Sequence, residues 1–193
     1  MKKKICFSFL LISFSFITIA QTVKIKKLPK SIEEFVSMRN KIATTPQGGA
    51  AMFMIALKIH TTNPDLAKKC FVAIVDRKLL REGDVYKGFK LLNSDMGLIK
   101  SQVAKDKNIP NSYIKGATPK NHYKVKLPYI FEFSSNKYSG SIEAGDFKLF
   151  IACSGASSPR PIRMKKNNRG LWKTSNWSSV LVGIMKPPID DDL

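Results

Sequence analysis

TPQGGAAMFMIALKIH, residues 45–60, is the stretch that decides the fold. Thr45 followed by Pro46 is typical of a helix start, because a capping side chain is followed by proline at the first helical position. Glycines and alanines come next, and residues 52–57 are apolar on almost every side of a helix. A helix that is apolar all round is buried. We therefore expect a central helix over residues 45–60, with small residues that let neighbouring elements approach closely.

Three further helices are predicted around this one. Ser31, with Glu34 three residues later, forms a capping box that opens a helix before the central one. The sequence NPD at residues 63–65 repeats the start signal, and this helix is predicted to end near Arg77. A fourth helix is predicted from NSD at residues 93–95 and ends before a proline at position 110.

The second half of the chain changes its pattern to alternating, β-like runs. They cover residues 125–133, 147–154, 162–166, 171–174 and 180–185. The sequence KNNRG, residues 166–170, is a hairpin turn because asparagine and glycine tolerate positive φ. Helices followed by consecutive strands indicate the α+β class, with about four N-terminal helices packed on one face of a C-terminal antiparallel sheet. In detail we expect a curved sheet of the cystatin-like or nuclear-transport-factor-like kind.

The first twenty residues are typical of a secretory signal peptide. Three lysines precede an apolar run of about 15 residues, and Thr18-Ile19-Ala20 puts small residues at the cleavage positions. The run is shorter than the roughly 20 residues that a membrane-spanning helix needs. We expect cleavage near Ala20, export to the periplasm or the medium, and no transmembrane span in the mature chain.

The mature chain is expected to hold one domain. Residues 21–30 form a basic arm, of which we predict residues 23–30 to be flexible, and residues 31–193 form a single α+β domain. We find no internal repeat and no long linker.

The charge of the chain favours anionic partners. Lysine and arginine number 33 against 14 acidic residues, which gives a formal net charge of +19. Such a field favours nucleic acid, acidic polysaccharide or lipid headgroups. Only six of the basic residues are arginine, however, and base readout favours the planar fork of arginine. A merely solvated basic surface therefore stays the alternative to a specific anionic polymer or envelope surface.

Two cysteines, Cys70 and Cys153, remain after cleavage. Each shares a face with apolar neighbours, so both are predicted to point inward. In an oxidising compartment they could form one disulfide. The other interpretation is two buried thiols that pack as small apolar residues.

Several motifs resemble those of an uncharacterised bacterial family that is catalogued as a domain of unknown function. The resemblance covers about residues 31–192 and implies a single family domain, with no activity and no catalytic residue to carry over. The motifs are TTPQGGAAMF (44–53), DVYKGFKL (84–91), IPNSYIKGATPKNHY (109–123) and ACSGASSPRPIRMKKNNRGLWKTSNWSSVLVGIMKPPIDD (152–191).

A candidate functional loop lies at residues 108–122, where Tyr113, Lys115 and His122 carry the reactive groups. A small hydrolase would combine this loop with residues 153–158, using Ser154 or Ser157 as nucleophile and His122 as base. The simpler interpretation is an ordered surface connection. Carboxylates for glycoside hydrolysis could come from Glu132, Glu143 and Asp146, although Glu132 points outward and is expected to form a salt bridge with a lysine.

A candidate anion-binding cluster follows in the predicted strands. Basic groups interleaved with aromatic rings can hold phosphates and stack on bases. The alternatives are that the tryptophan packs in the core and that the arginines pair with the acidic tail at residues 190–192. The cluster consists of Arg160, Arg163, Arg169 and Trp172.

The motifs of cofactor and metal sites, HExxH, paired CxxC and a glycine-rich phosphate loop, do not occur in the chain, and we predict no cofactor. Our leading hypothesis is an exported, non-enzymatic binding or scaffold protein with an unknown partner. The alternatives are the small hydrolase and a charge-driven binder of nucleic acid or an anionic envelope surface.

Overall fold

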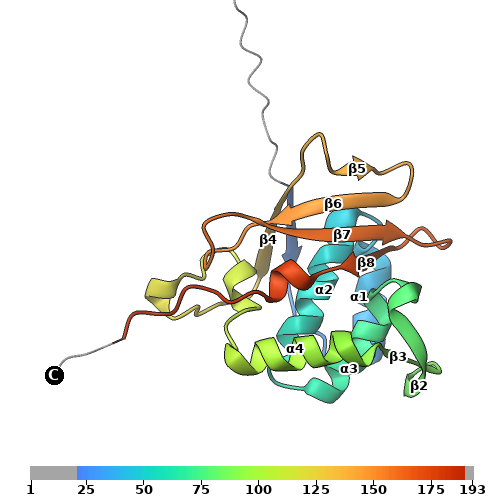
Figure 1. Ribbon diagram of the computed structural model, residues 1–193, viewed down its shortest axis with the longest axis horizontal. Coiled ribbons are helices and arrows are strands. Elements are labelled where there is room, and N and C mark those ends of the chain that lie inside the picture. The colour runs from blue at the N-terminus through green and yellow to red at the C-terminus, as the bar shows by residue number, and fades with distance from the viewer. Residues whose placement is uncertain (1–20, 190–193) are drawn as a thin grey trace, which may run out of the picture.

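The computed structural model describes residues 21–189. The predicted signal peptide, residues 1–20, and the acidic tail at residues 190–192 lie outside the described residues. The expected α+β class is confirmed, with four helices and a six-stranded antiparallel sheet (Figure 1). Within the described range, no helix is both long and apolar enough to cross a membrane.

The helices begin where local capping predicts. They are α1 (Ile32–Ile42), α2 (Pro46–His60), α3 (Pro64–Ile74) and α4 (Asn93–Lys105). The side-chain oxygens of Ser31, Thr45 and Asn63 accept hydrogen bonds from backbone amides three residues ahead, at 3.2, 3.1 and 3.0 Å. The fourth helix differs, because Asn93 is its first residue and not its cap.

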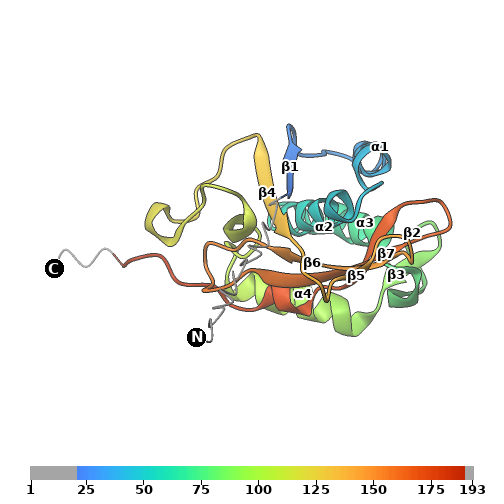
Figure 2. The same ribbon diagram turned by 90° about the horizontal axis from the view of Figure 1, so that it is seen from above.

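Helix α2 is the centre of the molecule, as its composition predicts. Every residue from Gly48 to Leu57 is buried, and the helix packs against the sheet and against α1 and α3. Figure 2 shows α1, α2 and α3 on one side of strands β6 (Asp146–Ile151) and β7 (Arg160–Lys166). Gly49 permits the close approach, because a Cβ atom there would lie 2.5 Å from the backbone oxygen of Trp172.

The sheet has the order β1-β4-β6-β7-β8, and the short β5 pairs with β6. Buried and partly exposed residues alternate along its main strands, so one face covers the core and the other faces solvent. In both views β1 and β4 lie at a steep angle to β6 and β7 (Figures 1 and 2). The strands not yet given are β1 (Gln21–Ile25), β4 (Tyr129–Ser134), β5 (Gly140–Ser141) and β8 (Trp172–Asn176).

Two sequence-based expectations were wrong, and one element was missed. The basic arm is not flexible over residues 23–25, because residues 21–25 form β1 and pair with β4 from Gln21↔Phe133 to Ile25↔Tyr129. Residues 180–185 are not a strand. Their start belongs to the 3-10 helix η4 (Ser178–Leu181), which packs beside α4. A hairpin of β2 (Leu80–Tyr86) and β3 (Phe89–Leu91) was not foreseen, since its charged residues hide the alternation.

Candidate functional site

The sheet splits between β4 and the end of β6. Their register pairs are Phe133↔Ile151 and Ser134↔Phe150, and the amide of Ala152 still donates to the carbonyl oxygen of Glu132 at 2.9 Å. The loop at residues 112–118 enters the gap. The amide of Lys115 donates to the carbonyl oxygen of Ile130 on one side at 2.9 Å, and the amide of Ser154 donates to that of Ser112 on the other side, also at 2.9 Å.

Tyr113 anchors this loop to the C-terminal segment. Its ring is 2 % exposed, and its hydroxyl donates to the carbonyl oxygen of Val180 at 2.9 Å. Burial, with a further contribution from Cys153, raises the pKa of the Tyr113 hydroxyl well above its usual value. This tyrosine is therefore neutral and holds the loop in place.

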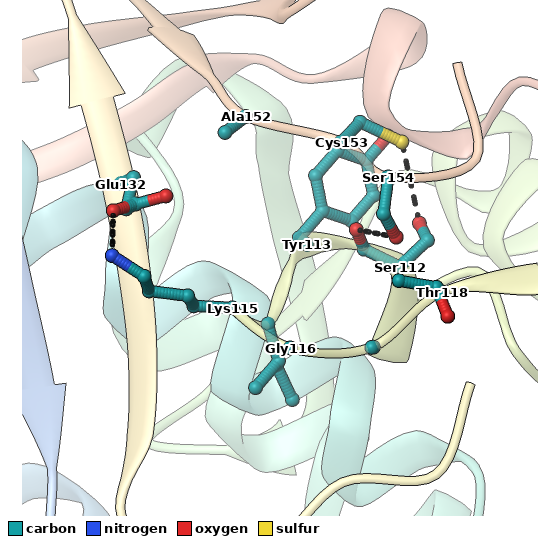
Figure 3. Close-up of a pocket in the computed structure, with 11 residues that line it drawn as sticks. Ser112, Tyr113, Lys115, Gly116, Thr118, Glu132, Ala152, Cys153 and Ser154 are labelled. Atoms are coloured by element: carbon teal, nitrogen blue, oxygen red, sulfur yellow. Dashed lines mark hydrogen bonds and ion pairs between the residues drawn. The ribbon is translucent and has the colours of Figure 1, made fainter. Parts of the chain in front are cut away.

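A cleft of about 280 Å³ remains in the split, between the loop and the end of β6. Figure 3 shows an ion pair of Lys115 and Glu132 on one side of it and a serine–cysteine cluster on the other. Residues 112–118 of the predicted loop and the segment that contains Cys153 and Ser154 thus border one shared cleft. The lining residues are Ser112 to Thr118, Glu132 and Ala152 to Ser154.

The serine–cysteine cluster ties the two walls of the cleft together. The Ser112 hydroxyl donates to the carbonyl oxygen of Ile109 at 2.8 Å and lies 3.4 Å from Cys153 Sγ. The contact between the Ser112 hydroxyl and Cys153 Sγ links the loop to the segment after β6. The Ser154 hydroxyl donates to the Ser112 carbonyl oxygen at 3.0 Å. All three polar side chains are engaged with the protein itself.

The ion pair on the other wall is more accessible. Lys115 Nζ lies 2.7 Å from Glu132 Oε1, and the two side chains are 59 % and 31 % exposed. The salt bridge that was expected for Glu132 is thus confirmed. A pair this exposed contributes only about 0.2–1 kcal/mol to stability. A ligand that separates Lys115 from Glu132 therefore costs the protein little free energy. Glu132 Oε2 accepts no hydrogen bond from the described residues.

The candidate loop residues take different places. Lys115 lines the cleft and Tyr113 contributes its buried ring. His122 does not line it. This residue is exposed and ends the short 3-10 helix η3 (Pro119–Asn121) with a φ of 56°. Sequence reasoning did not single out Ser112, which is buried. The signal for it was weak, because a lone serine in a polar loop is common.

The four residues of the candidate anion-binding cluster do not come together. Trp172 is 1 % exposed and packs in the core. Arg160 and Arg169 lie at the start of β7 and in the turn after it, so they are separated by about 20 Å of strand. The Arg160 guanidinium donates to the carbonyl oxygens of Ser179, Val182 and Gly183 at 2.8–3.0 Å, which holds the C-terminal segment.

Arg163 and the remaining acidic candidates form local contacts. Arg163 Nε donates to Asp146 Oδ1 at 2.6 Å. This contact lowers the pKa of the Asp146 carboxyl. Glu143 accepts a hydrogen bond from the Ser141 hydroxyl. The predicted pairing of the arginines with residues 190–192 falls outside the described residues.

Cys70 and Cys153 are both buried and are not bonded to each other. Burial raises the pKa of the Cys70 thiol to about 12. Over residues 21–189, no three His, Cys, Asp or Glu side chains gather as metal ligands would.

Comparison with known proteins places the chain in a family. No curated protein and no solved structure matched it, and the cystatin-like or nuclear-transport-factor-like detail of the sheet stays a prediction. The family model described as "Domain of unknown function (DUF6935)" matches residues 27–188. This match covers every described element from α1 to η4 and agrees with the resemblance in the sequence motifs. The chain therefore belongs to the DUF6935 family of domains of unknown function.

Proposed function

We propose that this chain is an exported, non-enzymatic binding protein and that the cleft between residues 112–118 and 152–154 takes a small zwitterion, such as an amino acid or a short peptide. The observation that carries the proposal is the partly exposed ion pair of Lys115 and Glu132 on one wall of a mostly apolar cleft. The ammonium group of such a ligand takes the place of Lys115 beside Glu132. Its carboxylate takes the place of Glu132 beside Lys115.

The size and lining of the cleft support a small ligand. Its volume of about 280 Å³ is just under the 300–1,000 Å³ range of sites for drug-sized molecules. Ile114, Ala117 and Ala152 supply apolar contact. Glu132 Oε2 is available to accept from an ammonium group, and Lys115 is exposed enough to turn toward a carboxylate.

The small hydrolase receives less support. Its nucleophile would be Ser154, whose hydroxyl already donates to the Ser112 carbonyl oxygen, or Ser157, which does not line the cleft. Its base would be His122, which does not line the cleft. A nucleophile and its base need to lie within hydrogen-bond reach of each other. We therefore favour binding over acyl transfer.

Export is part of the proposal because of the sequence of residues 1–20. Strand β1 begins at Gln21, directly after the predicted cleavage position, so a cleaved chain keeps every described element. N-terminal sequencing of the protein from fractionated cells tests this part. A chain found in the cytosol with Met1 in place would contradict it.

Calorimetric titration with the free amino acids and a panel of alanyl dipeptides tests the ligand class. We expect at least one probe to bind, and Lys115→Met or Glu132→Gln to raise its Kd by about tenfold or more, because each removes a charged hydrogen bond. Lys124→Met is the matched control, since it removes an exposed lysine that does not line the cleft. Binding that is absent, or equal in all variants, would refute the cleft as the site.

A further inference from the structure

The solvent face of the sheet carries a row of hydrogen-bond donors across three strands. Lys148 on β6 is the register partner of Arg163 on β7, and Arg163 is in turn the partner of Asn176 on β8. Register partners on one face of neighbouring strands lie side by side. Adjacent strands are about 4.8 Å apart, so the three side chains span roughly 10 Å.

Two of these neighbours have the same charge. Like charges directly opposite each other destabilise a sheet. The carboxylate of Asp146 contacts Arg163 through Nε alone, and neither terminal nitrogen of that guanidinium has a partner among the described residues. Lys148 forms no ion pair within residues 21–189, and its ammonium lies 5.4 Å from the centroid of the Phe150 ring. The row thus has unused positive charge.

The row lies in a hollow of about 250 Å³, and Asp146, which contacts Arg163 Nε, is not among the residues that line it. At the Asn176 end, the amide and the hydroxyl of Ser178 donate to Asn176 Oδ1, each at 3.4 Å. Because the carbonyl oxygen of the Asn176 side chain is used in this way, its NH₂ group is left to bind a ligand. The lining residues are Lys148, Pro161, Arg163, Asn176, Ser178 and Ser179.

We propose that Lys148, Arg163 and Asn176 form a binding site for a tetrahedral oxyanion, that is, a phosphate or sulfate group. The terminal nitrogens of Arg163 form a fork that matches two oxygens of such a group. Lys148 adds a point charge on one side and the Asn176 amide adds a neutral donor on the other. An oxyanion between Lys148 and Arg163 also relieves the repulsion of these two cations. This site is separate from the cleft and does not depend on the function proposed for it.

The test is an amide chemical-shift titration of the full mature chain by NMR at pH 7. Sodium phosphate is compared with sodium chloride at equal ionic strength. We expect saturable shifts at residues 176–179 with phosphate and none with chloride. Lys148→Gln and Arg163→Gln are each expected to raise the Kd for phosphate about tenfold or more. Lys120→Gln, which removes the same charge from an exposed position in η3, is expected to leave it unchanged.

A second titration with a heparin hexasaccharide separates the two sources of the group. Tighter saturation by the hexasaccharide, with the same variants weakened, indicates a sulfate or phosphate carried on a polymer. Equal or weaker saturation, counted per oxyanion, indicates the free ion. Two results would overturn the site: shifts that phosphate and chloride cause equally, or variants at Lys148 and Arg163 that bind phosphate as well as Lys120→Gln does. A dispersed spectrum of each variant shows that it is folded.

Discussion

Lys173 makes the stability of the protein depend on pH in an unusual direction. Its ammonium, together with the guanidinium of Arg39, donates to the carbonyl oxygen of Ala73 near the end of α3. Burial lowers the pKa of the Lys173 ammonium from 10.5 to about 7, with Arg39 adding to the effect and Asp76 opposing it. Folding therefore disfavours the protonated form of this side chain.

The sign and size of the effect follow from proton linkage. Between pH 7 and 9 the unfolded chain keeps the proton on Lys173 and the folded chain loses it, so the free energy of unfolding rises with pH. For a shift from 10.5 to about 7, the gain over these two pH units is roughly 2 kcal/mol. The stabilisation is absent below pH 7, where both states bind the proton.

Urea unfolding at pH 7, 8 and 9, followed by tryptophan fluorescence, measures this gain. We expect it in the wild-type protein and expect Lys173→Met to abolish it, since methionine has no proton to lose. Lys165→Met is the matched control, because Lys165 is the register partner of Lys173 on β7, and this variant should keep the gain. The reasoning is refuted if wild type and Lys173→Met respond to pH in parallel.

Two further predictions concern packing and the C-terminal segment. Gly49→Ala should lower the free energy of unfolding by about 1–3 kcal/mol, because its Cβ would lie 2.5 Å from the Trp172 backbone oxygen. Gly97→Ala in α4, where nothing lies within 4 Å, should raise it by about 0.5–1 kcal/mol; equal thermal shifts for the two variants would contradict this account. Arg160→Met should free residues 179–183 from three hydrogen bonds, so limited proteolysis should cut there faster than in wild type. An unchanged cleavage pattern would show that the Tyr113 and Tyr123 contacts hold the segment without Arg160.

The helices were predicted well because their signals are local. The capping oxygens of Ser31, Thr45 and Asn63 bind amides only three residues away, so a short stretch of sequence contains both partners. The buried nature of α2 was equally visible, since its apolar residues surround the whole helix. By contrast, β1 was taken for a flexible arm. Its partner β4 is more than a hundred residues away, so no local pattern shows the pairing.

The candidate site was predicted in part. Tyr113 and Lys115 do belong to the cleft, and the segment after β6 does border it. His122 was expected to act with them, but it lies at the end of η3 and does not line the cleft. The basic cluster was chosen from closeness in sequence, yet a strand separates its members by about 3.3 Å per residue and alternates their faces. Arg163 does belong to a candidate anion site, but its partners there, Lys148 and Asn176, come from neighbouring strands.

The sequence by itself determined the α+β class, the helix starts and the buried central helix, because capping and periodicity depend on residues three or four positions apart. The tertiary structure alone decided the split between β4 and β6 and the row of Lys148, Arg163 and Asn176. Both depend on the register between strands that are distant along the chain. A register shift of one residue turns each side chain to the other face, so no local pattern specifies which side chains meet.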